Sequence, residues 1–128
     1  WKNGTEEKEA VFHLYYRKNP FQGGFSVACG LEYVVDFLQN FRIDETDVAY
    51  LATLKGSDGA SLFDEGFLDY LRKIEFNCDI EAVPEGSVVF PQEPLLRVTG
   101  PLSQCQLLET TLLNILNFQT LLATKAAR

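Results

Sequence analysis

The chain has 128 residues, 46% of them hydrophobic, with 18 acidic and 11 basic side chains and a formal net charge of −7. This length and apolar content suffice for one folded domain with its own core, and they exclude a disordered tail. The acidic balance excludes general binding to nucleic acid, whose phosphates select basic faces, and no apolar run reaches the roughly 18 residues of a membrane span.

The cysteines and the ends of the sequence set its context. Cys29, Cys78 and Cys105 are odd in number, and their spacings match no zinc or redox motif, which favours a reducing, cytoplasmic location. The sequence opens on Trp1 with no signal peptide, and it closes in a segment of helical character. We therefore expect residues 1–128 to be a single domain belonging to a longer protein.

The first predicted element is a strand over residues 9–17. Its apolar side chains alternate, so Phe12, Leu14 and Tyr16 are expected to face the core. A loop rich in Pro and Gly follows. Residues 26–41 then place apolar side chains at helical spacing and predict a helix.

Two shorter helices are predicted next, each starting at an aspartate. Asp44 is the expected N-cap of the first and Asp64 that of the second. Phe67, Leu68 and Leu71 form the expected inner stripe of the second helix. The carboxylates near both starts are interpreted as caps and first-turn charges rather than as an acid and base pair.

The last third returns to β character at 76–83. Two further runs of β-formers, 87–90 and 95–98, are separated by a Pro-Gln-Glu-Pro turn and contain no evident nucleophile, base or metal ligand. Ser103 and Gln106 fit a capping box at the start of the longest helix. Its predicted apolar stripe is Leu108, Leu112, Ile115, Leu116 and Leu122. The order of strands, helical cluster, small β-unit and long helix predicts the α+β class.

Basic residues near the Pro/Gly loop are the best candidates for binding an anion. Arg17 can offer a planar fork to phosphate or carboxylate, and Lys18 and Asn19 follow it into the loop. The alternative is a strand end whose charges are simply solvated. The loop glycines match neither nucleotide-binding pattern of glycines. His13 is the only histidine, and a single histidine on a strand is more often structural than catalytic.

Several segments together resemble the N-terminal region of nicotinate phosphoribosyltransferases. The resemblance covers nearly the whole chain in the family's order, and its two most specific blocks are VPEGSVVFPQEPLLRVTGPL and QLLETTLLNILNFQTLLATKAAR. The segments that carry it are Tyr16–Phe21, Gly23–Phe25, Gly30–Glu32, Val83–Leu102 and Gln106–Arg128. The resemblance implies the N-terminal domain of a type II phosphoribosyltransferase, with a helical cluster, a small β-sandwich or barrel-like unit and a long C-terminal helix.

The resemblance implies an enzyme of NAD salvage. The family joins nicotinate to 5-phosphoribosyl 1-diphosphate, giving nicotinate mononucleotide and diphosphate, and couples the reaction to ATP hydrolysis with Mg²⁺. Its phosphoryl-accepting histidine and phosphate loops belong to a downstream α/β barrel, and a substrate-stacking tyrosine precedes the position of Trp1. His13 does not match that histidine. We therefore expect the isolated chain to bind no metal or cofactor by itself and to be inactive.

Related phosphoribosyltransferases form homodimers in which the N-terminal domain of one subunit helps to close the active site of the other. This implies that Arg17, Lys18 and the Asn19–Gly24 loop, including Gly23, approach the partner's phosphates. Lys125 and Arg128, at the end of the last helix, are further candidates. The small β-unit would then serve as scaffold and subunit contact.

Two other classes of protein remain as alternatives. A carrier domain for biotin or lipoate also uses turn-bounded β-units, but it needs a lysine at a hairpin tip, and residues 80–102 contain none. A non-catalytic interaction domain would account for the acidic composition, but it would not account for the ordered set of motifs.

Overall fold

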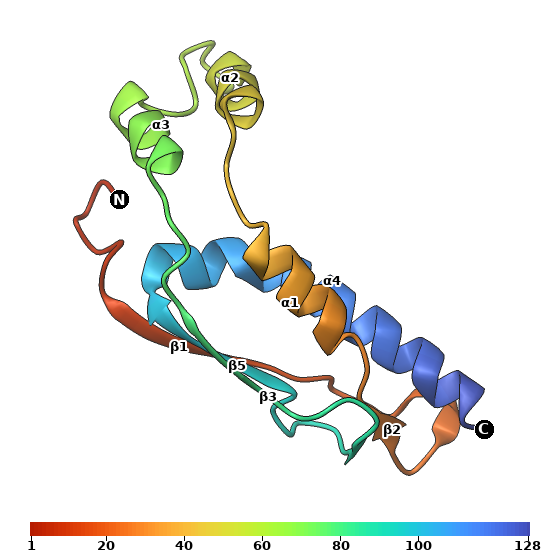
Figure 1. The fold of residues 1–128 in the computed structure, drawn as a ribbon. Helices are drawn as coiled ribbons and strands as arrows, with labels where there is room; N and C mark the ends of the chain where they lie inside the picture. The colour runs from red at the N-terminus through yellow and green to blue at the C-terminus, as the bar shows by residue number, and fades with distance from the viewer.

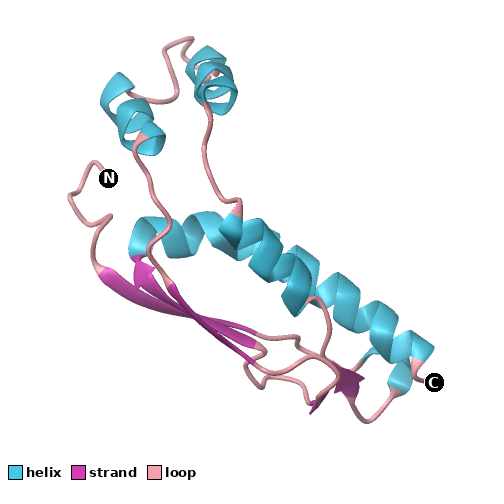
Figure 2. Ribbon diagram, viewed as in Figure 1, coloured by secondary structure: helices cyan, strands magenta, loops and turns pink.

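Strands pair across long stretches of sequence in the computed structural model, which describes residues 1–128. Helices and strands mix in the α+β manner that the sequence predicts, and this class is confirmed (Figure 2). The elements are β1 (Glu9–Leu14), the 3-10 helix η1 (Pro20–Gln22), β2 (Ser26–Val27), α1 (Leu31–Gln39), α2 (Glu45–Thr53), α3 (Glu65–Arg72), β3 (Asp79–Ala82), β4 (Val88–Val89), β5 (Leu96–Pro101) and α4 (Leu102–Ala126).

Two small antiparallel sheets organise the chain. The larger has the strand order β1-β5-β3, and the smaller pairs β2 with β4. The two predicted runs at 87–90 and 95–98 therefore do not pair with each other: the first contributes β4 to the smaller sheet and the second begins the central strand of the larger one. The Pro-Gln-Glu-Pro turn moves the chain from one sheet to the other.

The hydrophobic core lies between the larger sheet and α4. Helix α4 runs along one face of this sheet, and α1 lies beside α4 (Figure 1). The strand alternation predicted for β1 is confirmed, because Leu14 is buried and Phe12 packs against the core whereas Val11 and His13 are exposed. The buried core residues are Leu14, Val34, Leu38, Leu96, Val98, Cys105, Leu108, Leu112 and Leu116.

The helix predicted from residue 26 begins at Leu31 instead. Ser26 and Val27 pair with β4, and Gly30 then turns the backbone with φ of +108°, a conformation that favours glycine. A Cβ at Gly30 would lie 3.0 Å from the Cβ of Gln119, so glycine is also needed for the close approach to α4. The strand pairing of Ser26 and Val27 and the packing of Gly30 on α4 are tertiary contacts. The periodicity of residues 26–41 therefore could not reveal them.

A distant glutamate caps the first turn of α1. The Oε1 atom of Glu85 accepts the N–H groups of Gly30 and Leu31, each at 2.6 Å. Both donors would otherwise lack a partner, since the first N–H groups of a helix have no carbonyl inside it, and the carboxylate also meets the positive end of the helix dipole. The Pro-Glu-Gly turn thus fixes where α1 starts.

The two predicted aspartate caps differ in outcome. Asp44 forms a full capping box, accepting the N–H groups of Thr46 at 2.9 Å and Asp47 at 3.1 Å, while its own N–H donates to Asp47. The Thr46 hydroxyl and these N–H groups lower the pKa of Asp44. Asp64 stands at the N-cap of α3, but its carboxylate pairs with Lys2 at 2.8 Å and makes no capping bond.

The capping box predicted at Ser103 is wrong. Helix α4 starts at Leu102, whose N–H donates to the Lys8 carbonyl at 2.8 Å, and the Ser103 N–H donates to the Glu6 carbonyl at 3.1 Å. The Ser103 hydroxyl bonds to the Tyr70 hydroxyl at 2.6 Å instead. The segment leading into β1 therefore supplies the acceptors, which no local motif reveals.

Helix α4 follows its predicted stripe for most of its length. Leu108, Leu112 and Leu116 are buried, but Leu122 is 49% exposed. Towards the C-terminal end the buried side becomes polar, with Thr120 and Thr124 taking the place of leucine.

Helices α2 and α3 stand away from the sheet and α4 (Figure 1). Arg72 of α3 pairs with Glu45 of α2 at 3.2 Å, and the ring of Trp1 lies 5.9 Å from that of Phe67. None of the helices has the length and apolar content needed to cross a membrane.

The cap on α1 yields a test by hydrogen exchange. Replacing Glu85 by Ala in the full-length protein removes the acceptor of two N–H groups and is expected to cost about 1–2 kcal/mol locally. Amide exchange in the peptide covering 28–39 should then accelerate roughly 5- to 30-fold. Glu93→Ala, which removes an exposed carboxylate without a hydrogen bond, serves as the control. Equal exchange in both variants would contradict the cap.

Candidate functional site

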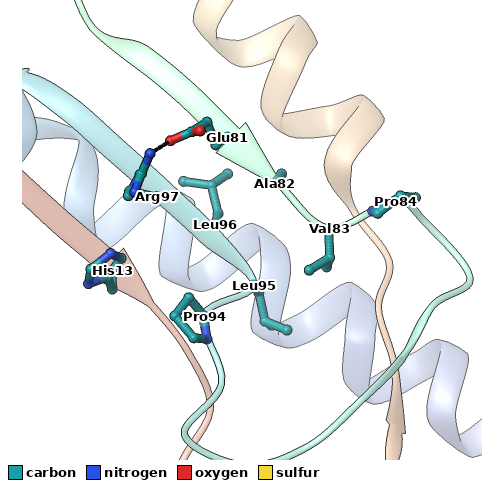
Figure 3. Close-up of a pocket in the computed structure, with 9 residues that line it drawn as sticks. All are labelled: His13, Glu81, Ala82, Val83, Pro84, Pro94, Leu95, Leu96 and Arg97. Atoms are coloured by element: carbon teal, nitrogen blue, oxygen red, sulfur yellow. Dashed lines mark ion pairs between the residues drawn. The ribbon is translucent and has the colours of Figure 1, made fainter.

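A shallow pocket lies at the edge of the larger sheet, between β3, β5 and β1. It has a volume of about 440 Å³ and is lined by His13, Glu81, Ala82, Val83, Pro84, Pro94, Leu95, Leu96 and Arg97 (Figure 3). His13 lies opposite Arg97 in the β1–β5 register, and Glu81 lies opposite Arg97 in the β3–β5 register. The three side chains thus form one row across the sheet.

The chemistry of this row is limited. Arg97 and Glu81 form an ion pair, so the positive charge of the guanidinium is already compensated. His13 makes no side-chain hydrogen bond, and no hydroxyl or thiol lines the pocket to serve as its nucleophile. The arrangement supports surface pairing of strands rather than catalysis.

A second recess lies between β1 and α4. It has a volume of about 460 Å³, and its polar groups include Arg17, the only predicted anion-binding residue in its lining. The lining residues are His13, Tyr15, Tyr16, Arg17, Glu109, Leu113 and Asn117. A guanidinium and an amide side chain here provide donors suited to a carboxylate or phosphate.

The predicted loop continues from this recess towards the end of α4. The chain before Arg17 is held at Tyr16, whose hydroxyl donates to the Val89 carbonyl at 2.7 Å and whose carbonyl accepts the Gln92 N–H at 2.9 Å. The hydroxyl also lies 3.1 Å from Oδ1 of Asn19. These contacts join the start of the loop to the Phe90–Gln92 turn.

The unusual backbone of the loop falls on residues that the sequence did not indicate. Phe21 and Gln22 both have φ of +56°, a left-handed conformation that costs roughly 1–3 kcal/mol for a residue with a side chain. Gly23, by contrast, has φ of −81° and Gly24 is not among the residues of positive φ. The sequence drew attention to the glycines of this loop, but the left-handed backbone lies on the two residues before them.

The end of α4 contacts this strained segment directly. Nη1 of Arg128 donates to the Phe21 carbonyl at 2.6 Å. The Nζ of Lys125 lies 4.9 Å from the centre of the Phe21 ring, and Cζ of Arg128 lies 5.8 Å from it. The structure therefore brings Lys125 and Arg128 to the Asn19–Gly24 loop, although the two segments are about a hundred residues apart in sequence.

Four basic side chains at this end of the molecule have no acidic partner. The ion pairs of the structure join Lys2 to Asp64, Arg72 to Glu45 and Asp69, and Arg97 to Glu81. The unpaired cations at the candidate site are Arg17, Lys18, Lys125 and Arg128. Cations are ordinary at a helix C-terminus, where they meet the negative end of the dipole, but here both also contact the loop. This group, with the Asn19–Gly24 loop, is called the cationic loop site below.

Two buried threonines fasten the other end of the loop to α4. The Val27 N–H donates to the Thr124 hydroxyl at 2.9 Å, and the Cys29 N–H donates to the Thr120 hydroxyl at 3.2 Å. The sequence pattern alone had assigned no role to either threonine. The signal was the i, i+4 spacing of two hydroxyls on the buried side of a helix.

Cys78 and Cys105 both contact Gly100, where a Cβ would come within 2.6 Å of the Cys78 sulfur. Burial, followed by the neighbouring Cys105 thiol, raises the pKa of Cys78 to about 12. Burial also raises the pKa of Cys105. Both thiols are therefore protonated and unreactive at neutral pH. No group of three or more His, Cys, Asp or Glu side chains is placed to hold a metal ion.

Comparison with known proteins gives consistent matches. The family model described as the nicotinate phosphoribosyltransferase (NAPRTase) N-terminal domain matches residues 1–117. All of the chain aligns at 45% identity with 22% of a nicotinate phosphoribosyltransferase from Caenorhabditis elegans, and at 44% identity with 25% of one from Bacillus subtilis. The crystal structure of human nicotinic acid phosphoribosyltransferase superposes with a TM-score of 0.88 at 41% identity, covering 99% of this chain and 25% of the human one.

The raised thiol pKa predicts slow alkylation of Cys78. At pH 8 in the full-length protein, iodoacetamide should modify Cys78 at least about a hundredfold more slowly than in the urea-unfolded chain. Because its pKa rises from 9.0 to about 12, its contribution to stability is complete below pH 9 and is lost as the pH rises towards 12. Mass spectrometry of the labelled peptides measures both rates, and similar rates in the two states would contradict the burial of this thiol.

Proposed function

The chain belongs to the nicotinate phosphoribosyltransferase N-terminal domain family, and we propose that it is the N-terminal domain of a longer enzyme of NAD salvage. That enzyme joins nicotinate to 5-phosphoribosyl 1-diphosphate, giving nicotinate mononucleotide and diphosphate, with ATP hydrolysis. The observation that carries the proposal is the match over the whole chain to the human enzyme, with its TM-score of 0.88. The chain spans only 21% to 25% of the length of the curated relatives it matches.

The role proposed for this domain is to contact the phosphorylated substrate. Arg17 and Lys18, with the loop residues Asn19, Gly23 and Gly24, face the phosphates, and Lys125 and Arg128 stand at the rim. The support is electrostatic, because these four cations have no acidic partner in a chain whose net charge is −7. Phosphoribosyl diphosphate is a polyanion, and an arginine fork binds phosphate oxygens in pairs.

The rest of the enzyme supplies the remaining chemistry in this proposal. The residues of this chain do not fit a site for Mg²⁺, since no three potential ligands converge. We therefore assign the binding of Mg²⁺ and ATP to the rest of the enzyme and expect the isolated domain to be inactive. We also propose a cytoplasmic location for the enzyme, which the three free cysteines support.

A second role follows from the exposed side of α4. Its buried stripe already packs on the sheet, yet Leu107, Phe118, Leu121 and Leu122 are 43%, 57%, 39% and 49% exposed. Successive spacing of eleven, three and one residues places these four side chains on one outer face of α4. A helix that is apolar on both sides is typical of one buried inside a larger protein. We propose that the rest of the enzyme or its homodimeric partner covers this face.

The carrier-domain alternative finds no support in the arrangement of residues 80–102. No lysine is available there for attachment, and the strands within it belong to two different sheets instead of one hairpin.

The phosphate contact is tested by Arg17→Ala in the full-length enzyme. Losing a charge-assisted pair of hydrogen bonds costs about 1.5–3 kcal/mol, so the apparent KM for phosphoribosyl diphosphate should rise roughly 10- to 100-fold with little change in the KM for nicotinate. Arg42→Ala, which removes an exposed cation between α1 and α2, is the matched control. A KM unchanged from the parent in a normally folded Arg17→Ala enzyme would remove Arg17 from the site.

The outer face of α4 is tested by Phe118→Asp. If the rest of the assembled enzyme covers this face, a buried charge there should lower the Tm of the full-length protein by about 5 °C or more and shift its dimer equilibrium if the partner subunit is the cover. Tyr50→Asp, at a ring 66% exposed on α2, controls for adding a charge to the surface. Differential scanning calorimetry and analytical ultracentrifugation report the two effects. Identical melting of both variants and the parent would show that the face is free.

A further inference from the structure

The two basic residues of the cationic loop site that precede the strained turn lie between two fixed points. On one side, the hydroxyl of Tyr16 is bonded to Val89 of β4 and its backbone carbonyl to Gln92 of the following turn. On the other side, Phe21 is attached to the end of α4 through Arg128. Arg17 and Lys18 themselves make no ion pair or side-chain hydrogen bond. The anchors at either end therefore fix the backbone from which these two side chains project, and the side chains make no polar contacts of their own.

The backbone at Phe21 is in a strained conformation. Two consecutive residues with side chains, Phe21 and Gln22, hold φ of +56°. Such a conformation persists only where the surroundings favour it over the relaxed alternatives, and such residues gather at functional sites. Within the loop, only the Gly23 N–H closes a turn, donating to the Pro20 carbonyl at 3.0 Å. This single bond leaves the strained pair to be held from outside.

Arg128 supplies that external hold at two levels. Its Nη1 donates one hydrogen bond, to the Phe21 carbonyl at 2.6 Å, while its guanidinium and the Lys125 ammonium lie over the Phe21 ring. Lys125 and Arg128, at the end of the chain's last helix, thus contact both the backbone and the side chain of Phe21. That helix end is itself fixed, because Thr120 and Thr124 bond to Cys29 and Val27 on the far side of the loop.

We propose that Arg128 is a positioning residue, which holds Phe21 and Gln22 in the left-handed conformation so that Arg17 and Lys18 point at the phosphates of the substrate. This inference rests on the proposed phosphate contact and assigns separate roles to its basic residues. Arg17 and Lys18 touch the ligand, and Arg128 acts on them through the loop. Lys125 adds to the hold through the Phe21 ring alone.

The division of roles predicts a rescue that a direct contact would not show. In the full-length enzyme, Arg128→Gln releases the Phe21 carbonyl, and the apparent KM for phosphoribosyl diphosphate should rise about tenfold with kcat nearly unchanged. Adding Gln22→Asn should recover at least half of that increase on a logarithmic scale. Asparagine adopts positive φ more readily than glutamine does, so the turn keeps its shape without the hold.

Two controls accompany the comparison. Gln106→Asn makes the same exchange on the exposed side of α4, where the backbone is helical, and should rescue nothing. Arg42→Gln removes a positive charge elsewhere and should leave the KM at the parent value. If Arg128→Gln yields no soluble enzyme, Arg128→Lys takes its place, because it keeps the charge but not the planar fork. Its KM is then measured with and without Gln22→Asn in the same way.

Each outcome has a distinct meaning. A raised KM that Gln22→Asn fails to lower would make Arg128 a direct ligand of the phosphate and overturn the positioning role. An unchanged KM for Arg128→Gln, with Arg17→Ala still defective, would overturn the hold while leaving the phosphate contact intact. If Arg17→Ala also binds normally, the proposed function of the loop fails, and this inference with it.

Discussion

The packing of Leu108, Leu112 and Leu116 on the central strand is the interaction on which the rest of the molecule depends. These leucines bury one side of α4 against Leu96 and Val98, and removing any of them would leave a cavity in the main core cluster of nine buried residues. Because α4 has 25 residues, anchoring its middle also fixes both of its ends. The N-terminal end then receives the chain before β1, and the C-terminal end reaches the loop after it.

The candidate site is a consequence of this anchoring. Helix α4 delivers two threonine hydroxyls and two cations to the segment between Phe21 and Cys29, which no local interaction would shape in this way. The strain at Phe21 and Gln22 is tolerated because the helix end that holds them is rigid. Two cations are thereby brought to the loop that follows Arg17 and Lys18, and a local group of positive charges attracts anions.

Sequence reasoning predicted those parts of the fold that local chemistry controls. The alternation of β1, the N-cap at Asp44 and most of the α4 stripe depend on neighbouring residues, and all are confirmed. Features made by distant residues were missed. Glu85 determines the start of α1 from 54 residues away, and the carbonyls of Glu6 and Lys8 replace the cap expected at Ser103. Leu122, near the C-terminal end of α4, is exposed because no other part of this chain packs against that side of the helix.

The same distinction applies to the site. Arg17 and Lys18 were proposed from the sequence because a charged strand end before a Pro/Gly loop is a local pattern. Their grouping with Lys125 and Arg128 came only from the resemblance, and the contact that joins the two segments at Phe21 is a tertiary one. The glycines drew attention to the loop, but its left-handed backbone lies on Phe21 and Gln22. The steric cost of positive φ makes glycine the usual residue there, and tertiary contacts can override that preference.

The most direct measurement is a crystal structure of the full-length enzyme with phosphoribosyl diphosphate bound. The account predicts that guanidinium nitrogens of Arg17 lie within about 3.2 Å of phosphate oxygens, with the Phe21 carbonyl still bonded to Arg128. It would be contradicted by a substrate bound more than about 6 Å from Arg17 and Lys18, beyond the reach of a direct hydrogen bond or of one bridging water.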